Sequence, residues 1–259
     1  MKHIILCSLV LISYSISTRA QDPFYKATSN LIVANEKKGT LDIGLNYEFQ
    51  NIQTQVIYNF TDKYFAFGTY NINKSSYTYQ TFIFGDTRAV ENNNSGYSFG
   101  GGIQKLGRIG NYKNLELLIG FESQKVNNFE FSPNYNPEDK DHLIQNYYKL
   151  FTQFNMIKSK TNYDFGYSLK FSYLKFTHFE YNNGYYFNNK AVFFLDPTLS
   201  FNYKVLSNKN LLLTSQIGAS LALNNIEYSY GDGGFTTFST VYLLSPILKF
   251  GIQYRFDVK

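Results

Sequence analysis

The chain has 259 residues, of which 44% are hydrophobic and 19% aromatic, with 24 Tyr, 25 Phe, no Trp and one Cys. A mean hydropathy of −0.29 excludes a protein built from membrane-spanning helices. It is compatible with a membrane β-barrel, in which lipid-facing and lumen-facing residues alternate. The formal net charge of +5 is too small to indicate nucleic acid as a partner. All-β barrels reach this length as one unit, so a single domain is expected.

Residues 1–20 predict an export signal that is removed from the mature chain. Lys2 precedes an apolar run over residues 4–16, and Thr18 and Ala20 are the small residues expected before a cleavage site. The run is too short for a spanning helix, which needs ~20 apolar residues. The only cysteine, Cys7, lies within the run. The residues before it do not suit lipid modification, so we expect a mature chain without cysteine and without disulfides.

After the signal, apolar residues recur at every second position in ten successive segments. This period places them on one face of a β-strand, with polar residues on the other. In the last segment, for example, Phe250, Ile252 and Tyr254 alternate with Gly251 and Gln253. The predicted strands are 41–49, 52–60, 64–72, 96–107, 114–125, 147–157, 163–173, 195–205, 211–223 and 248–256. Each has ~9 residues or more, enough to cross a bilayer as a tilted strand.

The connections between these segments alternate in length. Short turns are predicted at 61–63, at Gly110-Asn111, at 159–162 and at 207–210, and long loops at 73–95, 126–146, 174–194 and 224–246. The first hairpin, near Gln50-Asn51, is the one short connection among the long ones. Tight turns at one end and long loops at the other are typical of outer-membrane barrels. An even number of strands would leave both termini periplasmic.

The predicted fold class is therefore all-β, a single closed antiparallel transmembrane β-barrel of ten strands with up-and-down topology. Residues 21–259 would form it, with residues 21–39 as a short N-terminal periplasmic segment. Aromatic residues near strand ends, such as Tyr163, Tyr173 and Tyr254, suit the interfacial girdles of a membrane barrel. A soluble barrel or sandwich of many short strands is the alternative.

Four motifs give the chain a family resemblance. They are NEKKG at residues 35–39, IYNFTDK at 57–63, FLDPTL at 194–199 and FGIQYRF at 250–256. Together they resemble the uncharacterised small outer-membrane β-barrel families of Gram-negative bacteria. A last strand ending in an aromatic residue, here Phe256, is similar to the signal that barrel-insertion machinery reads. The resemblance implies that machinery and outer-membrane lipid as partners, and it implies no catalytic residue.

The polar faces of the predicted strands carry acids and bases in near balance. The inward acids are Asp42, Glu48, Glu116, Glu122, Asp164 and Asp196, and the inward bases are Lys149, Lys170, Lys204, Lys249 and Arg255. Charges packed inside a narrow barrel must be paired, because an unpaired buried ion costs on the order of several kcal/mol. We therefore expect a structural network that largely closes the lumen. A narrow pore or small-solute channel is the alternative.

Enzymatic, metal and ligand sites have weaker support. His142 and His178 are expected on outer loops and would suit an outer-membrane hydrolase only beside a nucleophile or activated water. Glu138, Asp139 and Asp141 lack the spacing of a dedicated Ca²⁺ loop. We expect no catalytic residue, cofactor or metal.

Two further features of the sequence concern binding. Gly100-Gly101-Gly102 is followed by no helix that would complete a phosphate site, so it is interpreted as a bend or close packing in a strand. Residues 181–187 and 228–235 are rich in Tyr, Asn and Gly. Such loops are candidate surfaces for an extracellular ligand or protein.

Overall fold

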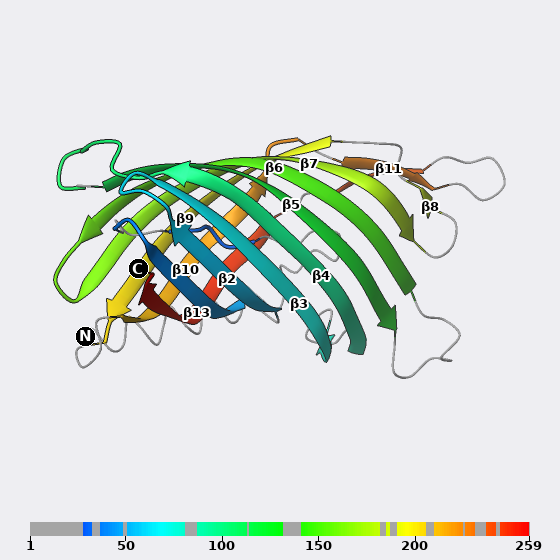
Figure 1. Cartoon of the computed structure of the whole chain (residues 1–259). Helices are drawn as coiled ribbons and strands as arrows, with labels where there is room; N and C mark the ends of the chain where they lie inside the picture. Colours follow the sequence, from blue (N-terminus) through cyan, green and yellow to red (C-terminus); the bar gives the residue numbers. More distant parts are fainter. Residues whose placement is uncertain are drawn as a thin grey trace, which may run out of the picture.

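The computed structural model describes residues 28–32, 37–48, 51–80, 87–112, 114–131, 141–181, 185–186, 191–205, 210–224, 226–230, 237–241 and 244–258. These residues form one β-barrel, drawn on its side in Figure 1, and Thr40 near the start of its wall pairs with Asp257 near its end. We call this end of the barrel the end near the termini. The described residues contain no helix that is both long and apolar enough to cross a membrane.

In this part of the chain, ten strands form the wall. They are β1 (Thr40–Glu48), β2 (Asn51–Asn59), β3 (Tyr64–Gln80), β4 (Thr87–Ile103), β5 (Asn114–Phe131), β6 (Asp141–Ser159), β7 (Tyr163–Tyr181), β9 (Ala191–Lys204), β10 (Leu211–Ala222) and β13 (Leu244–Asp257). Each pairs antiparallel with the next, and β1 pairs with β13 from Thr40↔Asp257 to Glu48↔Lys249. The predicted closed, up-and-down barrel of ten strands is confirmed.

Among the described residues, three short strands lie outside this wall. β8 (Tyr185–Tyr186) pairs with the end of β7. β11 (Ile226–Tyr230) and β12 (Thr237–Val241) pair with each other as a separate hairpin. They lie at the end of the barrel away from the termini (Figure 1).

Seven of the ten wall strands are longer than the sequence predicted, and most of the expected long loops are strand. β3 continues to Gln80 and β4 begins at Thr87, so the expected loop over residues 73–95 was wrong. The ranges 126–146 and 174–194 are likewise shortened by β5, β6, β7 and β9. Only β1 and β2 keep the nine residues expected of them.

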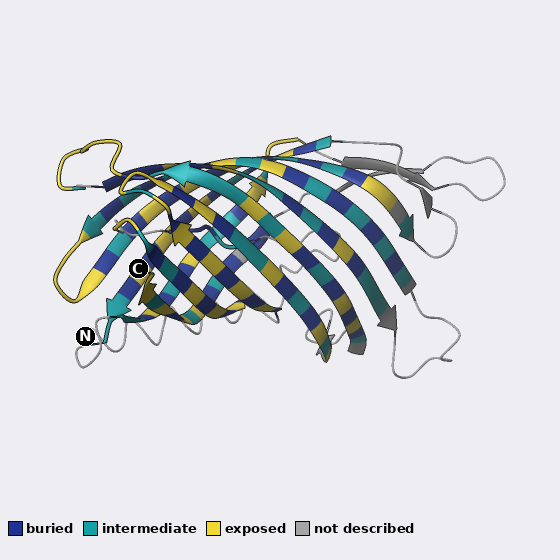
Figure 2. Cartoon of the chain, in the orientation of Figure 1, coloured by how far each residue is buried: buried dark blue, intermediate teal, exposed yellow. Residues whose placement is uncertain are grey.

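The reason is that the polar–apolar alternation reverses along the strands. In the half of the wall near the termini, β5 buries the inward Glu122 and exposes the outward Ile119. In the far half of the same strand, Val126 is buried inside and Lys125 is exposed outside. Figure 2 shows that the alternation of buried and exposed residues itself continues along the strands. The predicted strands were defined by apolar residues on the outward face. They therefore end too early, where this reversal begins.

The outer surface of the half near the termini is an apolar band with aromatic residues at both borders. Ile43, Leu45, Ile119, Leu213 and Ile252 are among its exposed side chains. Near the termini the border includes Tyr163 against Phe201, with ring centroids 5.5 Å apart, and Tyr254 against Phe256 at 4.7 Å. The far border includes Phe121 against Tyr148 at 6.2 Å and Tyr173 against Phe193 at 5.4 Å. An apolar band between aromatic girdles is the outer surface of a membrane barrel.

Candidate functional site: the closed lumen

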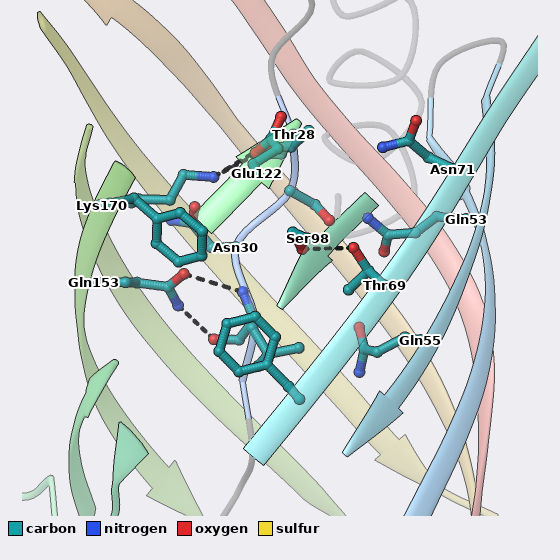
Figure 3. Close-up of a pocket in the computed structure, with 14 residues that line it drawn as sticks. Thr28, Asn30, Gln53, Gln55, Thr69, Asn71, Ser98, Glu122, Gln153 and Lys170 are labelled. Carbon is teal, nitrogen blue, oxygen red and sulfur yellow. Dashed lines mark hydrogen bonds between the residues drawn. The ribbon is translucent and has the colours of Figure 1, made fainter. Parts of the chain in front are cut away.

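A short segment of the chain, Thr28 to Ile32, lies inside the barrel. Asn30 is fully buried, and Thr28, Leu31 and Ile32 are also buried. Figure 3 shows Thr28 and Asn30 between Lys170 and Gln153 on one side and the wall residues Gln53 and Asn71 on the other. From the sequence, residues 21–39 were expected to form a periplasmic segment, and this insertion was not predicted. We call these five residues the inner segment.

Two glutamines from different strands hold the main chain of the inner segment. Gln153 of β6 accepts a hydrogen bond from the Leu31 N–H at 3.2 Å and donates one to the Leu31 carbonyl. Gln216 of β10 accepts from the Asn30 N–H at 3.1 Å and donates to the Asn30 carbonyl at 2.6 Å. Each amide satisfies a donor and an acceptor of one residue, so the segment is held whatever its side chains are.

The polar side chains of the inner segment reach further strands. Thr28 donates to Glu122 of β5 at 2.9 Å and accepts from Lys149 of β6 at 3.1 Å. The Lys170 ammonium of β7 donates to the Thr28 carbonyl at 2.8 Å.

Ser29 and Asn30, the next two residues of the inner segment, bind β1 and β9. Ser29 donates to Glu48 of β1. The Asn30 amide donates to the Asp196 carbonyl at 3.1 Å and to the Thr198 hydroxyl at 2.9 Å, both on β9. The inner segment therefore crosses the lumen with hydrogen bonds to β1, β5, β6, β7, β9 and β10.

The last two residues of the inner segment pack in apolar surroundings. Leu31 belongs to a buried cluster with Ile57, Phe65, Phe67 and Leu118. Ile32 packs on Ile157. A Cβ at Gly166 would lie 3.0 Å from the Ile32 side chain, so the glycine leaves room for it.

Nine of the eleven predicted lumen charges are buried, and Lys204 and Arg255 are partly buried. The ion pairs are Lys149 with Glu122 at 3.0 Å, Lys170 with Asp196 at 3.5 Å, Lys204 with Asp164 at 3.1 Å and Arg255 with Asp42 at 2.9 Å. Three of these pairs join residues that face each other in the strand register, and Asp164 reaches Lys204 two residues beyond its partner Asn202. Each pair therefore ties two neighbouring strands together.

The other three lumen charges take part in hydrogen bonds. Glu116 accepts from the Asn114 amide at 3.2 Å and the Asn155 amide at 2.8 Å. Lys249 donates to the Gln55 amide at 3.3 Å, and Glu48 binds Ser29. The lumen thus combines ion pairs with a hydrogen-bond network.

The charges are confined to one side of the lumen. Among the described side chains on the inward faces of β2, β3 and β4, none is charged. They include Gln53, Gln55, Asn71, Asn73, Asn92 and Asn94, all buried. A small pocket, with a cavity volume of about 20 Å³, lies between the inner segment and this neutral wall (Figure 3).

An apolar cluster lies further along the lumen, away from the termini. Eight inward hydrophobic side chains form one buried cluster: Val126, Leu143, Tyr147, Leu174, Phe176, Val192, Phe194 and Ile247. They come from β5, β6, β7, β9 and β13, so this apolar layer covers the same side of the lumen as the charges.

The two histidines lie in strands, so their expected place on loops was wrong. His142 is in β6, where its Nε2 lies 2.7 Å from the Asn127 amide oxygen and its ring stacks on Phe129 at 4.1 Å. His178 is in β7, 3.5 Å from Glu180. In the register His178 faces Asn146, four residues along β6 from His142, which is roughly 13 Å. The expected loop location fails because the far halves of β6 and β7 continue as strand.

The remaining candidate sites are the acidic group at residues 138–141 and the Tyr-rich loops. Among the described residues, no group of three or more His, Cys, Asp or Glu side chains is placed to hold a metal ion. Glu138 and Asp139 lie outside the described residues, as do most of the Tyr-rich ranges 181–187 and 228–235. The inner segment and the roles of Gln153 and Gln216 were not predicted from the sequence. Both glutamines do occupy polar positions of predicted strands.

The Gly100–102 run packs against aromatic rings inside the barrel. A Cβ at Gly100 would lie 2.8 Å from the Phe67 ring, and one at Gly102 would lie 2.5 Å from the Phe65 ring. A Cβ at Gly120, on the neighbouring strand, would lie 2.8 Å from the Cε1 atom of the Phe151 ring. The interpretation as close packing within a strand agrees with these distances.

The sequence matches no protein-family model and no curated protein sequence. Among solved structures, the outer-membrane protease OmpT from Escherichia coli is similar, with a TM-score of 0.51 over 85% of this chain and 94% of that one, at 10% identity. This chain has the fold of an outer-membrane β-barrel. The identity is far too low to transfer the activity of OmpT.

Two further barrels are similar at lower scores. The translocator domain of the autotransporter NalP from Neisseria meningitidis has 12% identity and a TM-score of 0.41, over 84% of this chain and 86% of that one. CarO2 from Acinetobacter baumannii has 12% identity and a TM-score of 0.38, over 85% of this chain and 100% of that one. At these scores the likeness carries no argument about role.

Proposed function

We propose that this chain is an integral outer-membrane protein with periplasmic termini, whose lumen is kept closed by its own inner segment. Its role is structural or surface-interacting, and it is not an enzyme. The apolar band between aromatic borders supports insertion in the membrane. The hydrogen-bond contact of His142 with Asn127 and its stacking on Phe129 support a structural place for this histidine.

The observation that carries the proposal is the set of bonds on the inner segment. Gln153 and Gln216 bind its main chain from β6 and β10, and Thr28 meets Glu122, Lys149 and Lys170. A segment that crosses the lumen and satisfies these buried polar groups obstructs the path of ions. It also makes the closed state favourable, because removing it would leave buried polar and charged groups without these partners.

Planar-bilayer conductance tests this proposal. The chain from residue 21 onward is compared with a variant that lacks residues 21–32, after both are shown to migrate as folded, heat-modifiable barrels. We expect silence from the longer chain and stable ohmic steps from the shorter one. Stable steps from the longer chain would refute a closed lumen, and silence from both would refute closure by the inner segment.

A narrow pore for small neutral solutes is the second candidate. The uncharged wall of β2, β3 and β4, with its amide side chains beside the pocket, favours it. Such a pore would pass neutral solutes with little ionic current. Swelling of vesicles that contain the chain from residue 21 onward, in an isotonic sugar solution, would favour this pore over the closed barrel.

A further inference from the structure

The connection between β4 and β5 folds against the outside of the barrel wall. The Tyr112 ring meets the edge of the Tyr167 ring of β7, with centroids 5.6 Å apart. Tyr167 is exposed while its neighbour Ser168 is buried in the lumen, so the contact is on the outer face. Leu115 of β5 alternates with the inward Glu116 and also faces outward, yet only 9% of it is exposed. Gly107 lies beside it.

This connection has a fixed shape. Ile109 and Tyr112 exchange two main-chain hydrogen bonds, at 3.1 and 2.9 Å. The Leu106 N–H donates to the Leu115 carbonyl at 3.1 Å, and the Lys105 N–H donates to the Asn114 amide oxygen at 2.7 Å. Its exposed side chains are therefore presented in a defined arrangement. Figure 2 shows the connection as a largely exposed loop at the end where the termini lie.

The exposed side chains of this connection include two apolar and two basic residues. Leu106 is 48% exposed and Ile109 51% exposed. Lys105, next to Leu106, and Arg108, next to Ile109, are also exposed, and residues 104–115 contain no acid. β6 lies between β5 and β7, so the contact of Tyr112 with Tyr167 of β7 brings the connection across the end of β6. Lys158, near this end of β6, is partly exposed.

The rest of this end of the barrel has the same sign of charge. Besides Lys105 and Arg108, the exposed charged residues described here are Lys37, Lys38, Lys63 and Lys160 against Asp62 and Asp257. Six exposed bases against two exposed acids make this end a positive surface beside the apolar band.

We propose that Lys105, Leu106, Arg108, Ile109 and Lys158 form a docking surface for the head groups of anionic phospholipids in the leaflet at the end of the termini. The inference rests on the proposed insertion in a membrane. Leu106 and Ile109 enter the boundary of the acyl chains, where their burial is favourable. Lys105, Arg108 and Lys158 then lie at the level of the phosphates, which attract them.

Fluorescence quenching can test this surface directly, because the chain has no Trp. Ile109→Trp places a single fluorophore in the connection, which we call the loop reporter. Ile119→Trp places one in the middle of the apolar band as a control, the band reporter. Each variant is reconstituted in vesicles that contain brominated phosphatidylglycerol or brominated phosphatidylcholine at equal mole fraction. The Ile109→Trp variant is also made with Lys105→Gln, Arg108→Gln and Lys158→Gln.

We expect brominated phosphatidylglycerol to quench the loop reporter more strongly than brominated phosphatidylcholine, and the two lipids to quench the band reporter equally. The preference of the loop reporter for phosphatidylglycerol over phosphatidylcholine should fall by roughly fivefold for each of the three cations replaced by Gln. Equal quenching of the loop reporter by the two lipids would overturn the selection of anionic head groups. If the lipids quench the band reporter and not the loop reporter, the proposed lipid docking is overturned, whereas the proposed membrane insertion is not. Absence of quenching at both positions would instead contradict the proposed membrane insertion.

Discussion

Glycine positions in the wall depend on the rings that cover them. Gly100 of β4 and Gly120 of β5 face each other in the register, and Gly100 also faces Phe67 of β3. A Cβ at Gly100 would lie 2.8 Å from the Phe67 ring and 2.7 Å from the Gly120 Cα. A side chain here must therefore displace both the ring and a neighbouring strand.

Gly100→Ala should destabilise the barrel by about 1–3 kcal/mol, the usual cost of overpacking a tightly packed site. Gly101→Ala is the matched control on the same strand, since its Cβ would meet only the Phe65 carbonyl oxygen, at 3.1 Å. The free energy of unfolding is measured by urea titration in detergent micelles. A loss for Gly101→Ala as large as that for Gly100→Ala would show that ring packing is not the cause.

At the scale of elements, the inner segment depends on the wall more than on its own side chains. Gln153 and Gln216 bind both main-chain groups of Leu31 and of Asn30. A wall variant should therefore release the segment without any change in the segment itself.

Gln153→Leu with Gln216→Leu should make residue 29 accessible. In the chain from residue 21 onward, which has no cysteine, Ser29→Cys provides a thiol for a water-soluble reagent. Loss of four hydrogen bonds of ~1 kcal/mol each should raise its labelling rate at least about tenfold. Lys38→Cys, at an exposed position, is the control and should react equally in both backgrounds. An unchanged rate at residue 29 would mean that the glutamines do not hold the segment.

At the scale of the whole molecule, closure of the barrel depends on the seam between the first and last strands. Asp42 of β1 accepts from Arg255 of β13 at 2.9 and 3.1 Å and from Gln253 at 2.8 Å. Asp42 is fully buried, so removal of Arg255 would leave a buried charge with less compensation. This pair joins the two ends of the sheet.

Arg255→Ala should lower stability by about 3 kcal/mol, and with it the temperature at which the folded band is lost in a heat-modifiable gel shift. The double variant Asp42→Asn with Arg255→Gln should recover part of the loss, because no charge is left buried. Lys63→Ala, on the exposed turn at the same end, should change stability by no more than ~0.5 kcal/mol. A double variant no more stable than Arg255→Ala would argue against a charge penalty at the seam.

The sequence by itself determined the barrel, its ten wall strands and the residues that carry its lumen charges. These follow from a period of two, which is a local property of a strand: Phe250 and Ile252 mark one face wherever that strand pairs. The short turns at residues 61–63 and 159–162 are equally local, and the structure has them between β2 and β3 and between β6 and β7.

The tertiary structure decided the strand lengths, the ion pairs and the closure of the lumen. Strand ends were missed because the alternation reverses beyond the apolar band, where the same strand buries Val126 and exposes Lys125. Pairing of Lys170 with Asp196 depends on the register of β7 and β9. The inner segment binds residues as far as 186 positions away, from Asn30 to Gln216. No local pattern encodes such a contact, because it exists only once the wall has closed around the segment.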